Sequence, residues 1–384
     1  MMGKIPLAWL QLKRERTRLA VALAGIAFAD ILMFMQLGFQ DSLYFSNVRL
    51  HSSLNADIVL INHQSNALLT MKSFSQRRLY RALDLPAVQS VNYLYVDYTI
   101  WKNPLTGRPR NILVIGINPE YNPLNLPGLQ ENLDKIKLPD VILYDRSSRK
   151  EYGPIVTLFE QGKPVTTEVR QRRIKVGGLF TLGTSFGADG NLITSDINFV
   201  RIFPLRQLGL IDIGLIRLKP GADANIAAQN LRKYLSQDVR VFTKEEFIEF
   251  ERNFWASSTA IGFIFTLGTI MGFIVGTVIV YQILYTEVAD HLAEYATLKA
   301  IGYTHNYLLV VVLQEALILA FLGYLPGIAV TMFLYQKARE ATLLPIMMSF
   351  DRTVLVLILT IIMCFISGVI AVRKLQSADP ADIF

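Results

Sequence analysis

Residues 253–286 read NFWASSTAIGFIFTLGTIMGFIVGTVIVYQILYT, a run of 34 residues without a charged side chain. A helix needs roughly 20 apolar residues to cross the hydrocarbon core of a bilayer, so this run is long enough to span a membrane. The whole sequence of 384 residues has a matching composition, with 52% apolar and 18% charged residues. The sequence therefore predicts a membrane protein and excludes disorder over most of its length.

Three further stretches have enough apolar length to span a membrane, namely residues 19–40, 307–335 and 353–372. We therefore expect four transmembrane helices. An alternative for the first stretch is a cleaved signal peptide, because Ala27-Phe28-Ala29 has the small-residue pattern of a cleavage site. The apolar run before Ala27 is short, however, and apolar character resumes through Phe39. A transmembrane helix is the favoured interpretation.

Basic residues flank the first and the last span, and they predict the orientation of the chain. Lys13, Arg14, Arg16 and Arg18 precede the first span, and Arg373 and Lys374 follow the fourth. Basic flanks stay on the cytoplasmic side, so both termini should be cytoplasmic. The expected order begins with a cytoplasmic interfacial helix at 1–18, for which a mere topology signal is the alternative. An extracytoplasmic domain (41–252) follows the first span, and a cytoplasmic loop (287–306) follows the second. A short outer loop (336–352) follows the third span, and a cytoplasmic tail (373–384) follows the fourth.

The extracytoplasmic domain is predicted to be α+β. Alternating or β-branched runs predict strands at 56–61, 90–101, 111–117, 141–144, 173–177 and 213–218, and helical patterns lie at 73–83 and 223–235. This block holds 27 Lys and Arg against 21 Asp and Glu, which are scattered along it. Scattered basic residues outside the cytoplasm indicate solvated surface and exclude nucleic acid as a partner. Cys364 is the only cysteine, so no disulfide forms within one chain.

The helix that enters the second span begins with a capping-box pattern. Thr243 and Glu246 have the spacing at which each side chain binds the other residue's backbone N–H group. No glycine or proline follows until Gly262, so the sequence predicts one helix from Lys244 to Tyr285. The membrane would hold about half of it, and the rest would form a stalk that carries motion across the bilayer. The alternative is a simple linker helix.

Two groups of glycines lie at spacings that let helices approach closely. Gly268, Gly272 and Gly276 form a doubled small-xxx-small pattern in the second span. This pattern is typical of a dimer seam, and packing against another helix of the same chain is the alternative. Gly323 and Gly327, beside Pro326 in the third span, predict a kink or a close helix contact.

Asp30 and Glu315 place carboxylates at membrane depth, where an ionisable residue often has a function. A proton relay would need a series of such groups, and the spans contain no such series. Structural hydrogen bonding is the favoured interpretation for both residues.

Motifs for catalysis are missing from the sequence. The four histidines (His51, His63, His291 and His305) lack metal-ligand spacing, and no G-x-x-x-x-G-K-[ST] phosphate loop occurs. A glycine-rich stretch at 177–190 does not have the phosphate-loop pattern. We therefore expect neither an enzyme nor a metal or cofactor site in this chain.

The cytoplasmic loop 287–306, EVADHLAEYATLKAIGYTHN, carries a family resemblance. It resembles the ERxxEIGxxRAxG signature of FtsX/MacB-type permeases, with Glu294, Lys299, Ala300 and Gly302 at matching places. Glu315, Gly323 and Gly327 are similar to that family's E-x7-G-x3-G pattern. The start PLAWLQLKRERTRL and the end DPADIF are closest to the DevC group of cyanobacterial permeases. His291-Leu292 and Tyr295-Ala296 depart from the signature, which puts the exact contacts of the loop in doubt.

The resemblance implies the permease subunit of an ABC exporter in the inner membrane, with no cofactor of its own. ATP and Mg²⁺ would bind a separate ATPase, two copies of which would pair with a permease homodimer. The loop would be the coupling helix, with ATPase contacts at Glu294, Tyr295, Lys299, Ala300 and Gly302. A membrane-fusion protein would lead from the outer domain to a TolC-like outer-membrane channel, and the cargo would be an amphiphile such as a glycolipid. The alternatives are an FtsX-like signalling protein that activates a cell-wall hydrolase and, less favoured, a membrane-anchored enzyme.

Overall fold

The computed structural model describes residues 16–291 and 305–376, and its contacts divide the chain into two units. The first, here called the membrane unit, consists of residues 1–42, 260–341 and 346–384. The second, the soluble unit, consists of residues 43–259 and 342–345. Each unit is described by itself. Residues 1–15, 292–304 and 377–384 lie outside the described part, and so does the expected interfacial helix up to residue 15.

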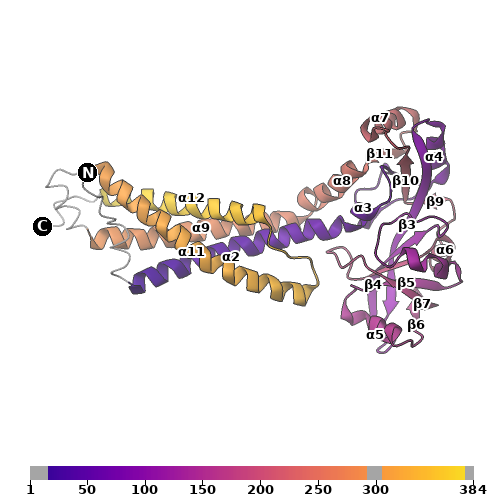
Figure 1. Cartoon of the computed structure of the whole chain (residues 1–384), viewed down its shortest axis with the longest axis horizontal. Helices are drawn as coiled ribbons and strands as arrows, with labels where there is room; N and C mark the ends of the chain where they lie inside the picture. The colour runs from indigo at the N-terminus through magenta and orange to yellow at the C-terminus, as the bar shows by residue number, and fades with distance from the viewer. Residues whose placement is uncertain (1–15, 292–304, 377–384) are drawn as a thin grey trace. The chain divides into compact units, whose positions relative to one another are not determined.

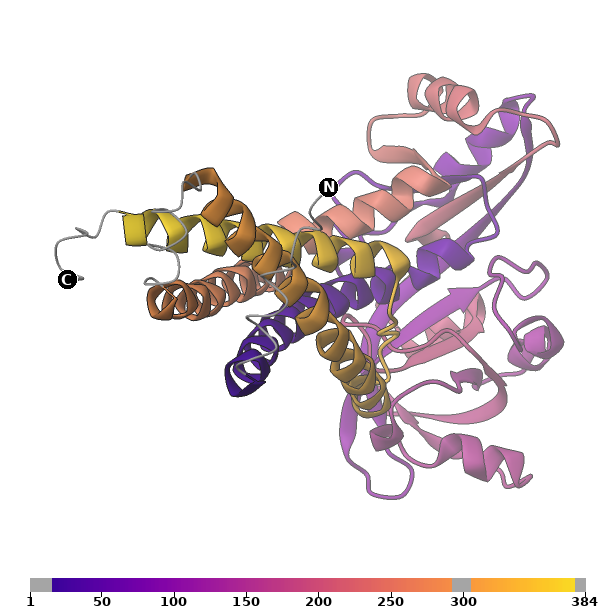
Figure 2. The ribbon, with the colours of Figure 1, turned by 60° about the vertical axis from the view of Figure 1, so that its left-hand side comes forward.

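Four helices of the described residues are long and apolar enough to cross a membrane, as the sequence predicts. They are α2 (Arg16–Asn47), α9 (Ala260–Asp290), α11 (His305–Thr342) and α12 (Phe350–Gln376), and Figures 1 and 2 show them from two sides. The helices α9 and α11 extend further than expected. Residues 287–290 therefore belong to α9 and residues 336–342 to α11, rather than to the predicted loops.

Small side chains allow the helices of the membrane unit to pack closely. Its buried core includes Ala22, Ile26 and Ala29 from α2, together with apolar residues of α9, α11 and α12. Near the other end of α2, the Arg352 guanidinium of α12 binds the Asp41 carboxylate, with a distance of 3.1 Å from Nε to Oδ2. The same guanidinium donates to the Tyr335 hydroxyl of α11 at 3.2 Å. These bonds join three of the four helices.

The soluble unit is built on a nine-stranded mixed sheet in the order β11-β1-β10-β3-β4-β8-β5-β7-β6. β6 also pairs with the long strand β3 through Trp101 and Val169, so the sheet curls back on itself. The strands are β1 (Ile58–Asn62), β3 (Val88–Lys102), β4 (Pro109–Ile117), β5 (Val141–Asp145), β6 (Thr166–Val169), β7 (Arg172–Phe180), β8 (Asn191–Ser195), β10 (Ile213–Leu218) and β11 (Val239–Thr243). Separately, β2 (Phe74–Ser75) pairs with β9 (Leu210–Ile211).

Short helices cover the sheet, and each face carries its own apolar core. One core includes residues of α4 (Gln76–Tyr80), α6 (Asp196–Ile202) and α7 (Ala224–Tyr234). The other includes Leu50 of α3 (Arg49–Ser53) and Phe247 of α8 (Lys244–Ser257). The remaining elements are α5 (Ile155–Glu160) and the 3-10 helices η1 (Leu68–Thr70), η2 (Arg81–Asp84), η3 (Gln130–Lys137) and η4 (Lys150–Tyr152). The predicted α+β class is confirmed, and all six predicted strands are present.

The prediction of one continuous helix from Lys244 to Tyr285 is wrong, although its start is right. The capping box is present, because the Glu246 N–H group donates to Thr243 Oγ1 and the Thr243 N–H group donates to the Glu246 carboxylate. α8 ends at Ser257, and α9 begins only at Ala260. Serine and threonine have low helix propensity, and their hydroxyls compete for backbone carbonyls. Thr259 shows this competition, since its hydroxyl donates to the Trp255 carbonyl oxygen at 2.8 Å.

Candidate functional site

Three segments of the soluble unit continue directly into the membrane helices. They are residues 43–53, which end α2 and form α3, residues 244–259 with α8, and the short strap 342–345 between α11 and α12. Within the soluble unit, all three segments lie against or beside residues 182–188, which read LGTSFGA and are here called the hub loop. Any force that these segments carry into the soluble unit therefore arrives in one region.

The hub loop is held in place by the carboxylate of Asp145, at the end of β5. Asp145 is fully buried and accepts hydrogen bonds from the backbone N–H groups of Leu182 (3.1 Å) and Gly183 (2.8 Å). It also accepts one from the side-chain amide of buried Asn191, at 2.7 Å. A buried carboxylate is stable only when its lone pairs are satisfied, and here several donors come from the loop and from the adjoining strand. Asn191 of β8 also donates to the Gly183 carbonyl oxygen at 3.0 Å, so side chains from two strands fix the loop to the sheet.

The end of α2 and the start of α3 contact the hub loop through two polar side chains. The Gly187 N–H group donates to Asn47 Oδ1 at 3.1 Å, and Arg49 Nη1 donates to the Leu182 carbonyl oxygen at 3.2 Å. Burial lowers the pKa of Arg49, and the nearby carboxylate of Asp145 opposes this effect. At Gly183, φ is +102°, and a Cβ atom would lie 1.9 Å from Arg49 Nη1. Glycine at this position therefore lets the guanidinium reach the loop.

The strap contacts the hub loop through Thr184. The fully buried Thr184 hydroxyl donates to the carbonyl oxygen of Leu343 at 3.0 Å. Leu343 has φ of +59°, the left-handed region that a leucine rarely adopts. Such a conformation persists only where surrounding contacts hold it. The hydrogen bond from Thr184 is one such contact.

The substitution Thr184→Val keeps the side-chain shape and removes this donor. We expect the free energy of unfolding of the soluble unit to fall by about 1 kcal/mol, the usual net value of one hydrogen bond. Chemical unfolding of the purified full chain, followed by tryptophan fluorescence, measures the change. Thr157→Val on the exposed face of α5 is the matched control. Equal stability of Thr184→Val and the control would show that the bond to the strap contributes nothing.

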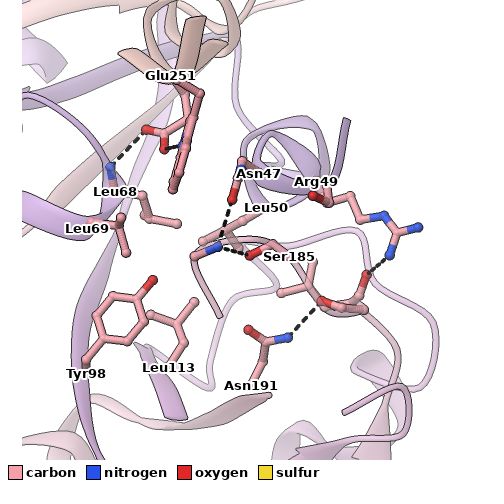
Figure 3. A pocket seen from close by; sticks show the side chains of 15 residues that line it. Asn47, Arg49, Leu50, Leu68, Leu69, Tyr98, Leu113, Ser185, Asn191 and Glu251 are labelled. Atoms are coloured by element: carbon pink, nitrogen blue, oxygen red, sulfur yellow. Dashed lines mark hydrogen bonds between the residues drawn. The ribbon is translucent and has the colours of Figure 1, made fainter. Parts of the chain in front are cut away.

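The third segment, α8, contributes Glu251, whose carboxylate is buried. It accepts hydrogen bonds from the Leu68 N–H group at 2.8 Å and from Trp255 Nε1 at 2.9 Å. Glu251 and Trp255 line a narrow cavity of about 20 Å³ together with Asn47, Arg49 and residues of the hub loop. Figure 3 shows these side chains converging from α2, α3, α8 and the sheet. This cavity, at the junction of the three segments, has room for about one water molecule. A larger cavity of about 590 Å³ also lies beside the hub loop, and Phe186, Gly187 and Ala188 are among the residues that line it.

The predicted ATPase-coupling residues lie outside the described residues. They are Glu294, Tyr295, Lys299, Ala300 and Gly302. Their role therefore stays a prediction.

The glycines of α9 pack against helices of their own chain. A Cβ atom at Gly276 would lie 2.6 Å from the Cβ of Ala29 on α2 and 2.3 Å from the sulfur of Met363 on α12. The nearest side chains to Gly272 and Gly268 are also on α2, and they are Met33 and Gln36. Helices α2 and α12 thus cover the glycine face of α9. This arrangement agrees with the alternative in which the glycines pack against helices of the same chain. The dimer seam predicted for these glycines does not agree with this arrangement.

The two glycines of α11 also face α2. The nearest side chains to Gly323 and Gly327 are those of Ile26 and Asp30. Glycine on α9 and α11 thus lets both helices approach α2 closely.

The two carboxylates within the spans are fully buried in the membrane unit. Asp30 Oδ1 accepts a hydrogen bond from the Thr360 hydroxyl of α12 at 2.5 Å, which agrees with structural hydrogen bonding. Among the described residues, no hydrogen-bond partner is found for either carboxylate oxygen of Glu315. The carboxylates of Glu287 on α9 and Glu315 repel each other when both are charged.

Sequence reasoning missed the residues that build the junction. Asp145, Asn47, Thr184 and Glu251 belong to no motif, because each acts through contacts with residues far away in the chain. The available signal was the glycine-rich stretch at 177–190. The stretch lacks the phosphate-loop pattern, and this absence excluded phosphate binding. It gave no sign that the stretch forms a contact region.

The fold defines a multi-pass membrane protein with a large α+β domain between its first and second spans. Residues 266–380, which include most of the last three spans, match the family model described as FtsX-like permease C-terminal. Over this part of the chain, the match agrees with the predicted resemblance to these permeases. Among curated proteins, none matches the sequence.

The solved structures that are similar to this chain include two domains that lie outside the membrane-spanning part of their proteins. The periplasmic region of MacB from Actinobacillus actinomycetemcomitans has 14% identity and a TM-score of 0.37, and the similarity covers 55% of this chain and 98% of that one. The extracellular domain of the ABC-type transporter YknZ from Gram-positive bacteria has 13% identity and a TM-score of 0.34, with coverage of 48% and 99%.

Proposed function

We propose that this chain is the permease subunit of an ABC-type exporter, in which a separate ATPase hydrolyses ATP and drives motion of the soluble unit. The FtsX-like permease match over residues 266–380 supports this class of protein. The lack of a phosphate-loop motif in the sequence supports an ATPase on another chain. The permease would work in the inner membrane as a homodimer with two ATPases.

The observation that carries the proposal is the meeting of three membrane-connected segments at the hub loop. Asn47, Thr184 and Glu251 take part in hydrogen bonds that tie these segments into the soluble unit. Hydrogen bonds require defined directions and distances. Movement of one segment would therefore change the hydrogen bonds that hold the other two segments. The cavity that Glu251 and Trp255 line, where the segments meet, is too small for a cargo molecule. This arrangement favours transmission of motion over passage of a substrate through the junction.

The finer features of the proposal come from the sequence resemblance to DevC-type permeases. The soluble unit would bind a periplasmic membrane-fusion protein, which leads to a TolC-like channel in the outer membrane. The cargo would be an amphiphile, and a glycolipid is the favoured kind. Motion of the soluble unit would then drive cargo through the assembled channel.

A second candidate is FtsX-like signalling, which is compatible with the FtsX-like permease match. The same motion would then activate a cell-wall hydrolase outside the membrane. The two candidates share the ATPase and the junction, and they differ in the protein bound by the soluble unit. A fusion protein indicates an exporter, whereas a hydrolase indicates signalling.

The coupling role of the cytoplasmic loop is tested by the double variant Glu294→Ala, Lys299→Ala. We expect ATP hydrolysis by the permease–ATPase complex to fall about tenfold, which corresponds to about 1.4 kcal/mol in the activation free energy. The reason is that the loop would no longer engage the ATPase through its charged side chains. Steady-state phosphate release from the purified complex is the measurement.

The matched control for this variant is Lys337→Ala, Glu340→Ala, which removes an exposed ion pair at the other end of α11. It should leave ATP hydrolysis unchanged. Wild-type hydrolysis and ATPase binding in the loop variant would overturn the coupling role. A loop variant that no longer folds would be recognised by its loss of a monodisperse elution peak.

A further inference from the structure

A buried acid–base pair joins the two helices of the soluble unit that lead to the first and second spans. His51 lies on α3 and Glu251 on α8, and both side chains are only 1% exposed. The distance from His51 Nε2 to Glu251 Oε2 is 3.5 Å. The pair thus bridges elements that are 200 residues apart in the sequence.

The surroundings of Glu251 fix its carboxylate from several sides. The Leu68 N–H group and Trp255 Nε1 donate to it, as described above. Tyr98 of β3 is the other titratable neighbour. Burial raises the pKa of the Tyr98 hydroxyl, and the charge of Glu251 raises it further. One carboxylate therefore links α8, the segment at Leu68 and α3.

The imidazole of His51 has fewer partners than the carboxylate. Its ring lies 4.5 Å from the ring of Phe247, measured between centroids. Within the part of the chain that the structure describes, no hydrogen-bond partner is found for either ring nitrogen. Glu251 is the charged group that lies 3.5 Å from the imidazole Nε2.

A buried contact between a carboxylate and an imidazole adds little to stability, because taking polar groups out of water offsets most of their attraction. Such a contact favours one relative position of the two helices, because the attraction falls as the distance between the two groups grows. Apolar contacts such as that between His51 and Phe247 tolerate sliding far better. Displacing α8 relative to α3 would leave both groups buried without their partner.

We propose that His51 and Glu251 form a latch that makes α3 and α8 move together, so that motion of either membrane-connected helix reaches the hub loop. Both are positioning residues, and they act through the helices that they join. The proposal rests on the proposed function of the chain as a permease that transmits motion. It assigns the coupling of the first and second spans, inside the soluble unit, to one pair of side chains.

The test uses the full chain in complex with its ATPase and measures backbone hydrogen exchange at residues 64–72 and 182–188, with and without ATP. The variants are Glu251→Gln, which removes the charge, and His51→Phe, which keeps the ring contact with Phe247. Glu249→Gln is the matched control, because it removes a carboxylate from an exposed position on α8. ATP hydrolysis is measured in parallel for every variant.

We expect ATP to change exchange at both segments in the wild type and in the Glu249→Gln control. In each latch variant this change should fall by about fivefold or more, the lower end of typical coupling between sites. ATP hydrolysis should persist, because neither latch residue belongs to the predicted coupling loop 287–306. A purely structural role would alter exchange equally with and without ATP, and the ATP-dependent difference would remain.

The outcomes separate the latch from the proposed function. A full ATP-dependent change in both latch variants overturns the latch and leaves the proposed function standing. Absence of any ATP-dependent change in the wild type overturns the proposed function and the latch with it. If Glu251→Gln fails to fold, His51→Phe decides the question, because it leaves the carboxylate with its two N–H donors.

Discussion

Replacing Asp145 with alanine should lower the free energy of unfolding of the soluble unit by about 4 kcal/mol. The substitution leaves the N–H groups of Leu182 and Gly183 and the amide of Asn191 without their acceptor. Each buried donor without a partner costs about 1–3 kcal/mol. Arg49 would also lose the carboxylate that favours its charge. The hub loop would then lose the hydrogen bonds that tie it to β5, while the bond from Asn191 to Gly183 remains.

Chemical unfolding of the full chain in detergent measures this effect. Trp101 and Trp255, both in the soluble unit, report on it through fluorescence. Asp134→Ala is the matched control, because the Asp134 side chain is 93% exposed. A loss of stability of less than about 1 kcal/mol for Asp145→Ala would contradict the role assigned to this carboxylate.

Replacing Gly276 with leucine should disrupt the membrane unit. Even a Cβ atom at this position would collide with Ala29 on α2 and with the end of the Met363 side chain on α12. The Met363 side chain can move, but the Cβ of Ala29 is fixed to its helix. We expect a loss of about 3 kcal/mol, at the upper end of overpacking effects. The thermal midpoint and the yield of monodisperse full chain in detergent report the loss.

The same variant separates the two interpretations of the glycine pattern. Packing within the chain predicts that a single chain becomes unstable, whereas a dimer seam predicts loss of self-association by a stable chain. Val278→Leu is the control, because Val278 lies on the same helix and is 58% exposed. A stable Gly276→Leu chain with weakened self-association would contradict the packing described here.

Much of the fold could be predicted from the sequence, because its signals are local. The four spans follow from runs of apolar residues, and the start of α8 follows from the capping box of Thr243 and Glu246. Runs rich in β-branched and aromatic residues predicted β3 and β4. The strand β8 was missed, since Asn191, Thr194 and Ser195 leave only two apolar residues in its sequence NLITS. The end of α8 was not predicted, because no glycine or proline marks the break between α8 and α9.

The junction could not be predicted, because its contacts join distant parts of the chain. The bond from Thr184 to Leu343 crosses 159 positions, and the bond from Gly187 to Asn47 crosses 140. A threonine or an asparagine is common at the surface, so its residue type alone indicates no function. Only the folded sheet places Asp145 below the loop and brings the membrane-connected segments to it.

The glycines show the limit of spacing as evidence. Gly268, Gly272 and Gly276 correctly indicated a close helix contact, and the partner was left open between two alternatives. The partner is α2 of the same chain, since Ala29 and Met33 lie against this face. The spacing of the glycines describes one face of α9 and does not show which helix packs against that face.

Co-purification is the most direct test that this chain is a permease driven by a separate ATPase. The tagged full-length chain would be extracted from its native membrane in mild detergent, and its partners identified and quantified by mass spectrometry. We expect a stoichiometric ATPase with a phosphate-loop motif, together with a membrane-fusion protein. A cell-wall hydrolase in place of the fusion protein would favour signalling, and the absence of any ATPase would contradict the proposed function.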